Sequence, residues 1–145
     1  MRGVVLSVNV SALKGTRKKP VDSAELIENF GLKGDVHAGK WHRQVSLLAV
    51  ESVRKLQEQV NAEFMPGDFA ENILTEGICL HDLPLGTKIT AGSAVLEVTQ
   101  IGKECHNDCE IKQRAGVCIM PKEGIFARVI RGGQVKKGDM LTVNE

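Results

Sequence analysis

The stretch LGTKITAGSAVLEVT, residues 85–99, indicates the fold of the chain. Residues 87–90 and 94–99 are short runs in which β-branched or apolar residues alternate with polar ones, a pattern typical of β-strands. Each run lies next to a glycine-centred turn, as strands do at the corners of small barrels. Residues 135–143 show a similar arrangement around Gly138, although the similarity is too short to be a repeat.

Five further segments have the composition of strands, namely residues 4–10, 44–48, 69–74, 125–130 and 140–143. With the two runs above, the sequence predicts about seven strands and few helices. This pattern favours a mainly-β fold, a closed β-barrel, and a single domain over residues 1–145.

Two segments have helical spacing. Residues 51–60 place Val53, Leu56 and Val60 on one face, and a second, shorter helix is predicted over residues 105–114. Residues 31–42 contain too many glycines and charges for either element, so we expect a long ordered loop there.

Composition excludes several classes of function. The chain has 19 Lys and Arg against 18 Asp and Glu, and only 3% aromatic residues, so it lacks the basic surplus and stacking aromatics of a nucleic-acid binder. No apolar run reaches the length of a membrane span or forms a signal peptide. We therefore expect a cytoplasmic protein with neither nucleic-acid nor membrane partners, in which clustered cysteines bind metal or react.

Three of the four cysteines lie between Cys105 and Cys118, and His106 follows the first. Cys105 comes after the strand 94–99 and near the start of the helix 105–114, where the helix dipole favours the thiolate. The thiolate is both a nucleophile and a ligand for soft metals. We therefore interpret Cys105 as the principal functional residue rather than a packing thiol.

Cys109 and Cys118 have more than one interpretation. The Cys-x3-Cys-x8-Cys spacing differs from the paired Cys-x2-Cys of a zinc ribbon, yet with His106 these thiols could supply four metal ligands. Either cysteine could instead resolve an oxidised Cys105, or simply pack in the interior. Cys79 is predicted to be a core residue, and His81 is assigned no functional role.

His37 lies in the segment GDVHAG, residues 34–39, whose glycines permit unusual backbone angles and close approach of a ligand. Four residues near it in the sequence are basic, namely Lys33, Lys40, His42 and Arg43. Such a group suits the binding of a phosphate, and it is equally typical of a solvated basic loop. Asn72 ends the turn-forming segment PGDFAEN, residues 66–72, where its amide could bind a ligand or cap the turn.

Four segments together resemble the MOSC domain, the C-terminal domain of molybdenum cofactor sulfurases, which also occurs alone in bacteria. They are residues 34–39, 43–48 (RQVSLL), 66–73 (PGDFAENI) and the segment around Cys105, in order over about residues 3–143. The resemblance implies a closed barrel with Greek-key connections, similar to the barrel domain of pyruvate kinase.

The resemblance also implies a function in handling the molybdenum cofactor or its sulfur. Cys105 matches the family's cysteine, which would carry sulfur or bind molybdenum, whereas His37, Arg43 and Asn72 match residues of the cofactor-binding motifs. The family commonly has proline before the cysteine; here Glu104 places a carboxylate beside the thiol, which disfavours the thiolate.

Partners and alternatives follow from what the chain contains. Nothing in it resembles the pyridoxal-phosphate desulfurase domain of the eukaryotic proteins, so a cysteine desulfurase would supply sulfur and a molybdoenzyme or cofactor-biosynthesis protein would receive the product. One alternative is a structural zinc or iron site formed by the cysteine cluster with His106. Another is a persulfide carrier that uses no molybdenum.

One cofactor site requires residues distant in sequence to meet at one mouth of the barrel. We therefore expect Cys105 to line a concave pocket, with His37 and Arg43 on its wall and Cys109 or Cys118 close to the thiol.

Overall fold

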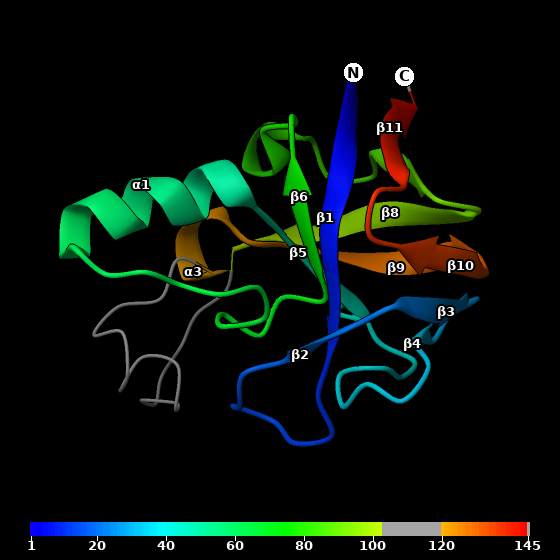
Figure 1. Cartoon of the computed structure of the whole chain (residues 1–145). Coiled ribbons are helices and arrows are strands. Elements are labelled where there is room, and N and C mark those ends of the chain that lie inside the picture. The colour runs from blue at the N-terminus through cyan, green and yellow to red at the C-terminus, as the bar shows by residue number, and fades with distance from the viewer. Residues whose placement is uncertain (103–119, 145) are drawn as a thin grey trace.

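The computed structural model describes residues 1–102 and 120–144 of the chain. Its main sheet has eight strands and closes on itself into a barrel of seven, because the first and last strands pair (Figure 1). The barrel strands, in spatial order, are β1 (Arg2–Val10), β6 (Ile73–Glu76), β5 (Val45–Ala49), β9 (Ile125–Arg131), β8 (Ala94–Ile101), β7 (Lys88–Ala91) and β11 (Met140–Asn144).

Closure comes from the antiparallel pairing of β1 with β11, in which Arg2 faces Thr142 and Val4 faces Met140. The β5–β6 pair is parallel, and the other pairs of barrel neighbours are antiparallel. Helix α1 (Val50–Val60) makes the crossover that a parallel pair requires. The mainly-β closed barrel is therefore confirmed.

The seven segments predicted as strands are the seven strands of the barrel, with one displacement. Residues 69–74 were expected to be a strand, but β6 begins only at Ile73. Ala70, inside the predicted segment, has a positive φ angle of 61°, which an extended strand cannot contain. Residues 66–69 form a turn before it.

A second sheet has three short strands and lies to the right of β1 in Figure 1. It consists of β10 (Gly133–Lys136), β3 (Ser23–Ile27) and β4 (Gly31–Leu32), while β2 (Lys19–Val21) extends the main sheet beside β1. The expected long loop over residues 31–42 is thus wrong at its start, because Leu32 pairs with Leu26. The four short strands were not predicted.

The interior divides into two apolar clusters on opposite faces of β5. Every residue of β5 is buried, with Val45 and Leu47 inside the barrel and Leu48 outside it. Leu48 packs with Val53 and Leu56 of α1, which confirms the predicted helix over residues 51–60. The second predicted helix, residues 105–114, lies outside the described residues.

Two short helical turns complete the described structure, η1 (Leu80–Asp82) and α3 (Met120–Glu123). Within the described part of the chain, no helix combines the length and the apolar character needed to cross a lipid bilayer.

The closed barrel predicts that a leucine-to-alanine substitution destabilises the protein far more inside the barrel than on its surface. Leu96 of β8 is 0% exposed and Leu85 is 64% exposed. Leu96→Ala should lower the free energy of unfolding by about 2–5 kcal/mol because it leaves a cavity, and Leu85→Ala should change it by about 0.5 kcal/mol or less. Urea unfolding measures both; equal effects would contradict the assigned core.

Candidate functional site

A buried ion pair lies at the end of the barrel where β1 terminates. The Nζ atom of Lys18 is 2.8 Å from Oδ1 of Asp35, and neither side chain is exposed to solvent. The ammonium also donates to the hydroxyl of Ser11 at 3.1 Å. Paired charges are rare in interiors because each loses its hydration, so this pair requires its surrounding hydrogen bonds.

The Asp35 carboxylate is held by the backbone on both oxygens. Oδ1 accepts the N–H of Ser11 at 3.0 Å, and Oδ2 accepts the N–H of His37 at 3.1 Å. Burial alone would raise the pKa of Asp35, but the hydrogen bond and charge of Lys18, with the bonds from Ser11 and Asn72, lower it. Asp35 is therefore a carboxylate at neutral pH.

The His37 ring lies against this pair. Its Nδ1 atom is 3.0 Å from Nζ of Lys18 and 3.8 Å from Oδ2 of Asp35, and its side chain is 27% exposed. Because an ammonium can only donate, Nδ1 accepts this hydrogen bond, which assigns the proton of a neutral His37 ring to Nε2. Asp35 and Lys18 thus determine both the position and the tautomer of the ring.

Asn72 joins three strands at the same end of the barrel. Its Oδ1 accepts the N–H and the hydroxyl of Ser46 at 2.9 and 3.2 Å, and its Nδ2 donates to the carbonyl of Asn9 at 3.1 Å. The side chain is 0% exposed. Asn72 therefore acts on the site by positioning β1, β5 and Asp35.

Glu71 is a second buried carboxylate, in the turn before β6. It accepts the N–H groups of Gly67 and Phe69 at 2.9 and 3.1 Å. Burial raises the pKa of Glu71 to about 7, despite these two hydrogen bonds. The same turn packs against the backbone of Lys18, whose N–H donates to the Gly67 carbonyl at 2.8 Å.

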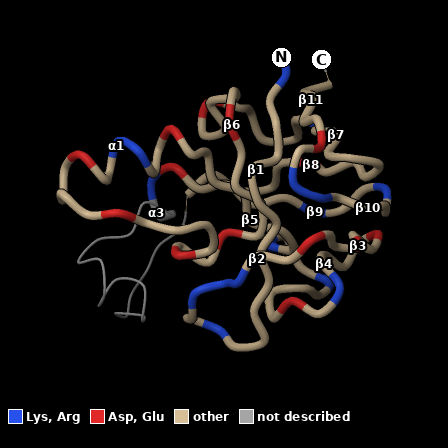
Figure 2. The backbone as a smooth tube through the Cα atoms, in the orientation of Figure 1, with Lys and Arg blue, Asp and Glu red and all other residues tan. Residues whose placement is uncertain are grey.

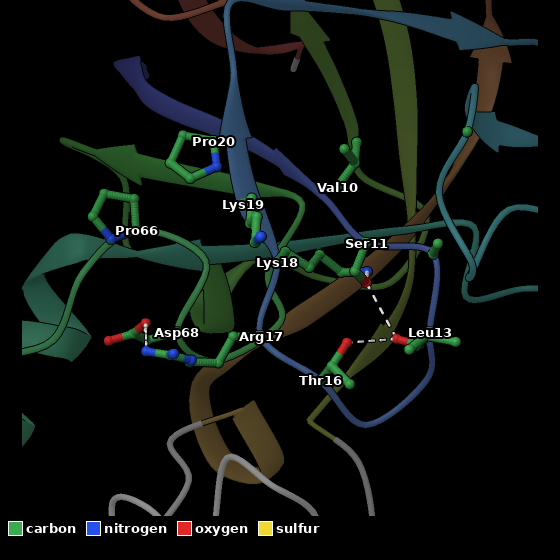
Figure 3. A pocket seen from close by; sticks show the side chains of 12 residues that line it. Val10, Ser11, Leu13, Thr16, Arg17, Lys18, Lys19, Pro20, Pro66 and Asp68 are labelled. Carbon is green, nitrogen blue, oxygen red and sulfur yellow. Dashed lines mark hydrogen bonds and ion pairs between the residues drawn. The ribbon is translucent and has the colours of Figure 1, made fainter.

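A pocket of about 780 Å³ opens beside the ion pair, between the loop after β1 and the turn before β6 (Figure 3). Its size lies within the range of small-molecule sites. Three consecutive cationic residues contribute to its wall, and Arg17 forms an ion pair with Asp68 across it at 3.3 Å. The lining residues are Val10, Ser11, Ala12, Leu13, Thr16, Arg17, Lys18, Lys19, Pro20, Gly34, Pro66 and Asp68.

Arg43 lies over two aromatic rings. Its guanidinium carbon is 5.9 Å from the centre of the Trp41 ring and 5.4 Å from that of Phe126, within reach of cation–π attraction. Its Nε donates to Gln100 at 3.0 Å. Trp41 connects Arg43 to the rest of the site, because the indole N–H donates to the His37 carbonyl at 2.8 Å.

Comparison with protein families matches residues 34–142 to the MOSC domain. The chain belongs to the MOSC domain family. The match covers most of the sequence, including His37, Arg43 and Asn72, and confirms the resemblance found in the motifs. A comparison with proteins of curated function found no significant relative.

Several solved structures share the fold of this MOSC domain. The YuaD protein from Bacillus subtilis superimposes with a TM-score of 0.82 and 19% identity, over 97% of this chain and 94% of that one. YiiM from Geobacillus stearothermophilus gives 0.75 and 21%, over 99% and 75%. YiiM from Escherichia coli gives 0.69 and 22%, over 100% and 70%. At these identities the similarity shows the fold.

The structure of this MOSC domain connects three of the predicted site residues. His37 and Asn72 both contact Asp35, and Arg43 reaches His37 through Trp41. His37 and Arg43 are not among the residues that line the 780 Å³ pocket, but His37 contacts Lys18, which lines it. The expected pocket beside Cys105, with His37 and Arg43 on its wall, stays a prediction, because Cys105 lies outside the described residues.

The predicted cysteine cluster, Cys105, Cys109 and Cys118 with His106, lies outside the described residues, and its roles stay predictions. The expectation that Cys79 is a core residue is wrong, because the residue is exposed. Its neighbours Ile78 and Leu80 are buried, with exposed fractions of 2% and 0%, so the side chain of Cys79 faces outward between two residues that face the interior.

Lys18 and Asp35 were missed as site residues. Lys18 belongs to the segment KGTRKK, residues 14–19, which has the composition of a solvated basic loop. Asp35 was visible in the GDVHAG motif, where the order Asp-x-His was the available signal. Only the fold shows that Lys18 reaches Asp35 across 17 positions of sequence.

The buried pair predicts that replacing Lys18 destabilises the protein much more than replacing the neighbouring Lys19. Lys18→Met should lower the free energy of unfolding by about 3–5 kcal/mol, because it leaves Asp35 buried without a countercharge. The exposed Lys19 serves as the matched control, and Lys19→Met should change stability by about 0.5 kcal/mol or less.

The double variant Lys18→Met/Asp35→Asn should be less destabilised than Lys18→Met alone, since no charge is then buried. Chemical denaturation of the four proteins measures the coupling. Equal losses for Lys18→Met and Lys19→Met would show that the ion pair is not buried in solution.

Glu71 predicts a specific pH dependence. Its pKa is about 7 in the folded state against 4.5 as the ordinary value, so between these limits the folded state binds a proton that the unfolded state has lost. The contribution of Glu71 to stability is therefore present at low pH and is lost as pH rises through about 7.

Wild type should lose on the order of 2–3 kcal/mol relative to Glu71→Gln between about pH 5 and about pH 8. Urea unfolding of both proteins at both pH values isolates the Glu71 contribution, because the other titrating groups are common to the pair. A constant difference between the two proteins would refute the raised pKa.

Proposed function

We propose that this MOSC domain binds the molybdenum cofactor, or its molybdopterin, and acts in cofactor maturation or sulfur transfer. Family membership supports a role related to this cofactor. The observation that carries the proposal is the cation-lined pocket beside the Lys18–Asp35 pair. The cofactor is the cargo of the domain in this proposal.

The residues of the pocket fit the anionic end of such a ligand. Lys and Arg residues cluster in the sequence along the loop before β2 and at the start of that strand (Figure 2). Arg17 is 40% exposed, and its contact with Asp68 is a partly exposed ion pair, which contributes little to stability. Arg17 can therefore exchange Asp68 for a phosphate, and Lys19 adds a second cation.

The buried pair has a positioning role in this proposal. The Lys18 ammonium is fully buried and bonded to Asp35, so it does not itself bind the phosphate. The backbone of the same residue is held against the turn before β6, because the Lys18 N–H donates to the Gly67 carbonyl. Residues 17–19 are thus fixed on both sides. A pocket held in this way loses little conformational entropy when a ligand binds.

Cys105 is the proposed sulfur carrier or molybdenum ligand. As a carrier, its thiol would accept the outer sulfur of a persulfide on a cysteine desulfurase, and the desulfurase would recover its own thiol. This exchange is redox-neutral and leaves a persulfide on Cys105. A molybdoenzyme or a cofactor-biosynthesis protein would then receive the product.

Binding of molybdopterin to the purified protein under anaerobic, reducing conditions tests the proposal. Arg17→Gln and Lys19→Gln each remove a charge-assisted hydrogen bond and should raise the Kd roughly 10-fold or more. Lys137→Gln, in the exposed turn between β10 and β11, is the matched control and should leave the Kd unchanged.

Cys105→Ser separates the two parts of the proposal. It should abolish the mass gain of one sulfur atom after incubation with a desulfurase and cysteine, or weaken the complex with the molybdenum-loaded cofactor, while the metal-free pterin still binds. Wild type that retains neither cofactor nor pterin would overturn the function. A sulfur gain without cofactor binding would favour the persulfide carrier.

A further inference from the structure

The turn after β6 presents three potential metal ligands on an anchored backbone. Cys79, His81 and Asp82 lie in or next to η1, and Leu80, between the first two, is 0% exposed. Side chains three residues apart eclipse in a 3-10 turn, which directs Cys79 and Asp82 to the same side. The core therefore holds this turn in place while its polar side chains face outward.

The distances between these ligand atoms approach those of a coordination sphere. Sγ of Cys79 is 3.8 Å from both ring nitrogens of His81. One ligand atom from each of the three residues, Asp82 included, lies within 4.8 Å of the other two. Tetrahedral zinc, with bonds of about 2.3 Å to sulfur and 2.0 Å to nitrogen, requires a sulfur–nitrogen separation of about 3.6 Å. The observed sulfur–nitrogen distances of 3.8 Å are close to this separation.

A fourth residue, Glu123 of α3, lies beside the histidine. Its Oε1 is 3.8 Å from Nδ1 of His81 and accepts the hydroxyl of Ser52 at 2.6 Å. Its Oε2 is 2.7 Å from Nζ of Lys55. A carboxylate beside the second nitrogen of a ligand histidine is the usual arrangement for orienting the ring.

The site is open to ions from solvent. A pocket of about 450 Å³ is lined by Cys79, His81 and Glu123 together with Ser52 and Lys55 of α1. Cys79 is exposed. The carboxylates of Asp82 and Glu123 supply two negative charges and Lys55 one positive charge, and the Cys79 thiol becomes a third negative ligand when a metal ion displaces its proton.

We propose that Cys79, His81 and Asp82 bind a divalent transition metal of the zinc class, with Glu123 orienting His81. One sulfur, one nitrogen and one oxygen ligand suit Zn²⁺ and Co²⁺ better than the hard cations Mg²⁺ or Ca²⁺. Three protein ligands leave a fourth position for water or another ligand.

This site is separate from the pocket of the proposed function. Strand β6 begins at Ile73, next to Asn72, and ends at Glu76, three residues before Cys79. β6 runs antiparallel to β1, so that Ile73 faces Val8 and Glu76 faces Val4. The metal site and the cation-lined pocket therefore lie at opposite ends of β6, and either proposal can fail without the other.

Cobalt titration of the 145-residue chain tests the proposal. Cys105, Cys109 and Cys118 are first replaced by serine, so that Cys79 is the remaining thiol. We expect one Co²⁺ per chain, with a thiolate-to-cobalt charge-transfer band that Zn²⁺ abolishes by displacement. Adding Cys79→Ser should eliminate the band, and His81→Gln should weaken Co²⁺ binding at least ~10-fold.

Proton release gives an independent measurement. A cysteine thiol is mostly protonated at neutral pH, so a metal ion that binds the thiolate must displace its proton. Calorimetry with Zn²⁺ in two buffers of different ionisation enthalpy should show about one proton released per ion. Cys79→Ser should lose this release.

His42→Gln is the matched control, because His42 is exposed and lies away from the site, with its Nε2 2.9 Å from Oε1 of Gln100. This variant should leave the Co²⁺ affinity unchanged. If the triple serine variant does not fold, Cys79→Ser in the otherwise unchanged chain should lower the bound Co²⁺ by one equivalent. Absence of stoichiometric binding in a folded triple variant, or a charge-transfer band that survives Cys79→Ser, would overturn the proposal.

Discussion

β1 forms backbone hydrogen bonds with β6 along one edge, and with β11 and then β2 along the other. An irregularity in its pairing with β6 shifts the register between Val5 and Ser7. In a regular strand Val5 and Val8 would face opposite sides, whereas here both belong to the barrel core. Closure of the barrel, burial of its interior and the position of the loop that follows Val10 all depend on this strand.

The Lys18–Asp35 pair fixes the loops at the end of the closed barrel relative to one another. It joins the loop after β1 to the loop after β4, and the Lys18 backbone also bonds to the turn before β6. A buried ion pair contributes little net stability because desolvation opposes the attraction between the charges. Its consequence is geometric: it determines the orientation of His37 and holds one wall of the pocket in place.

The sequence by itself determined the barrel. Strands such as β8 have a hydrophobic period of two that is visible in a single segment, and glycines mark the turns between them. The error at β6 has a local cause, since Ala70 adopts a left-handed backbone angle that composition does not reveal. The short strands of the second sheet have too few residues to show any period, so only their pairing with distant segments defines them.

The site was determined in part by the sequence and in part only by tertiary structure. Motif order predicts His37, Arg43 and Asn72 as site residues, because such motifs are local. Lys18 could not be distinguished from the exposed lysine beside it, and Cys79 was assigned to the core because apolar residues flank it. Burial and charge pairing depend on contacts between residues far apart in the chain, and such contacts exist only after the barrel has closed.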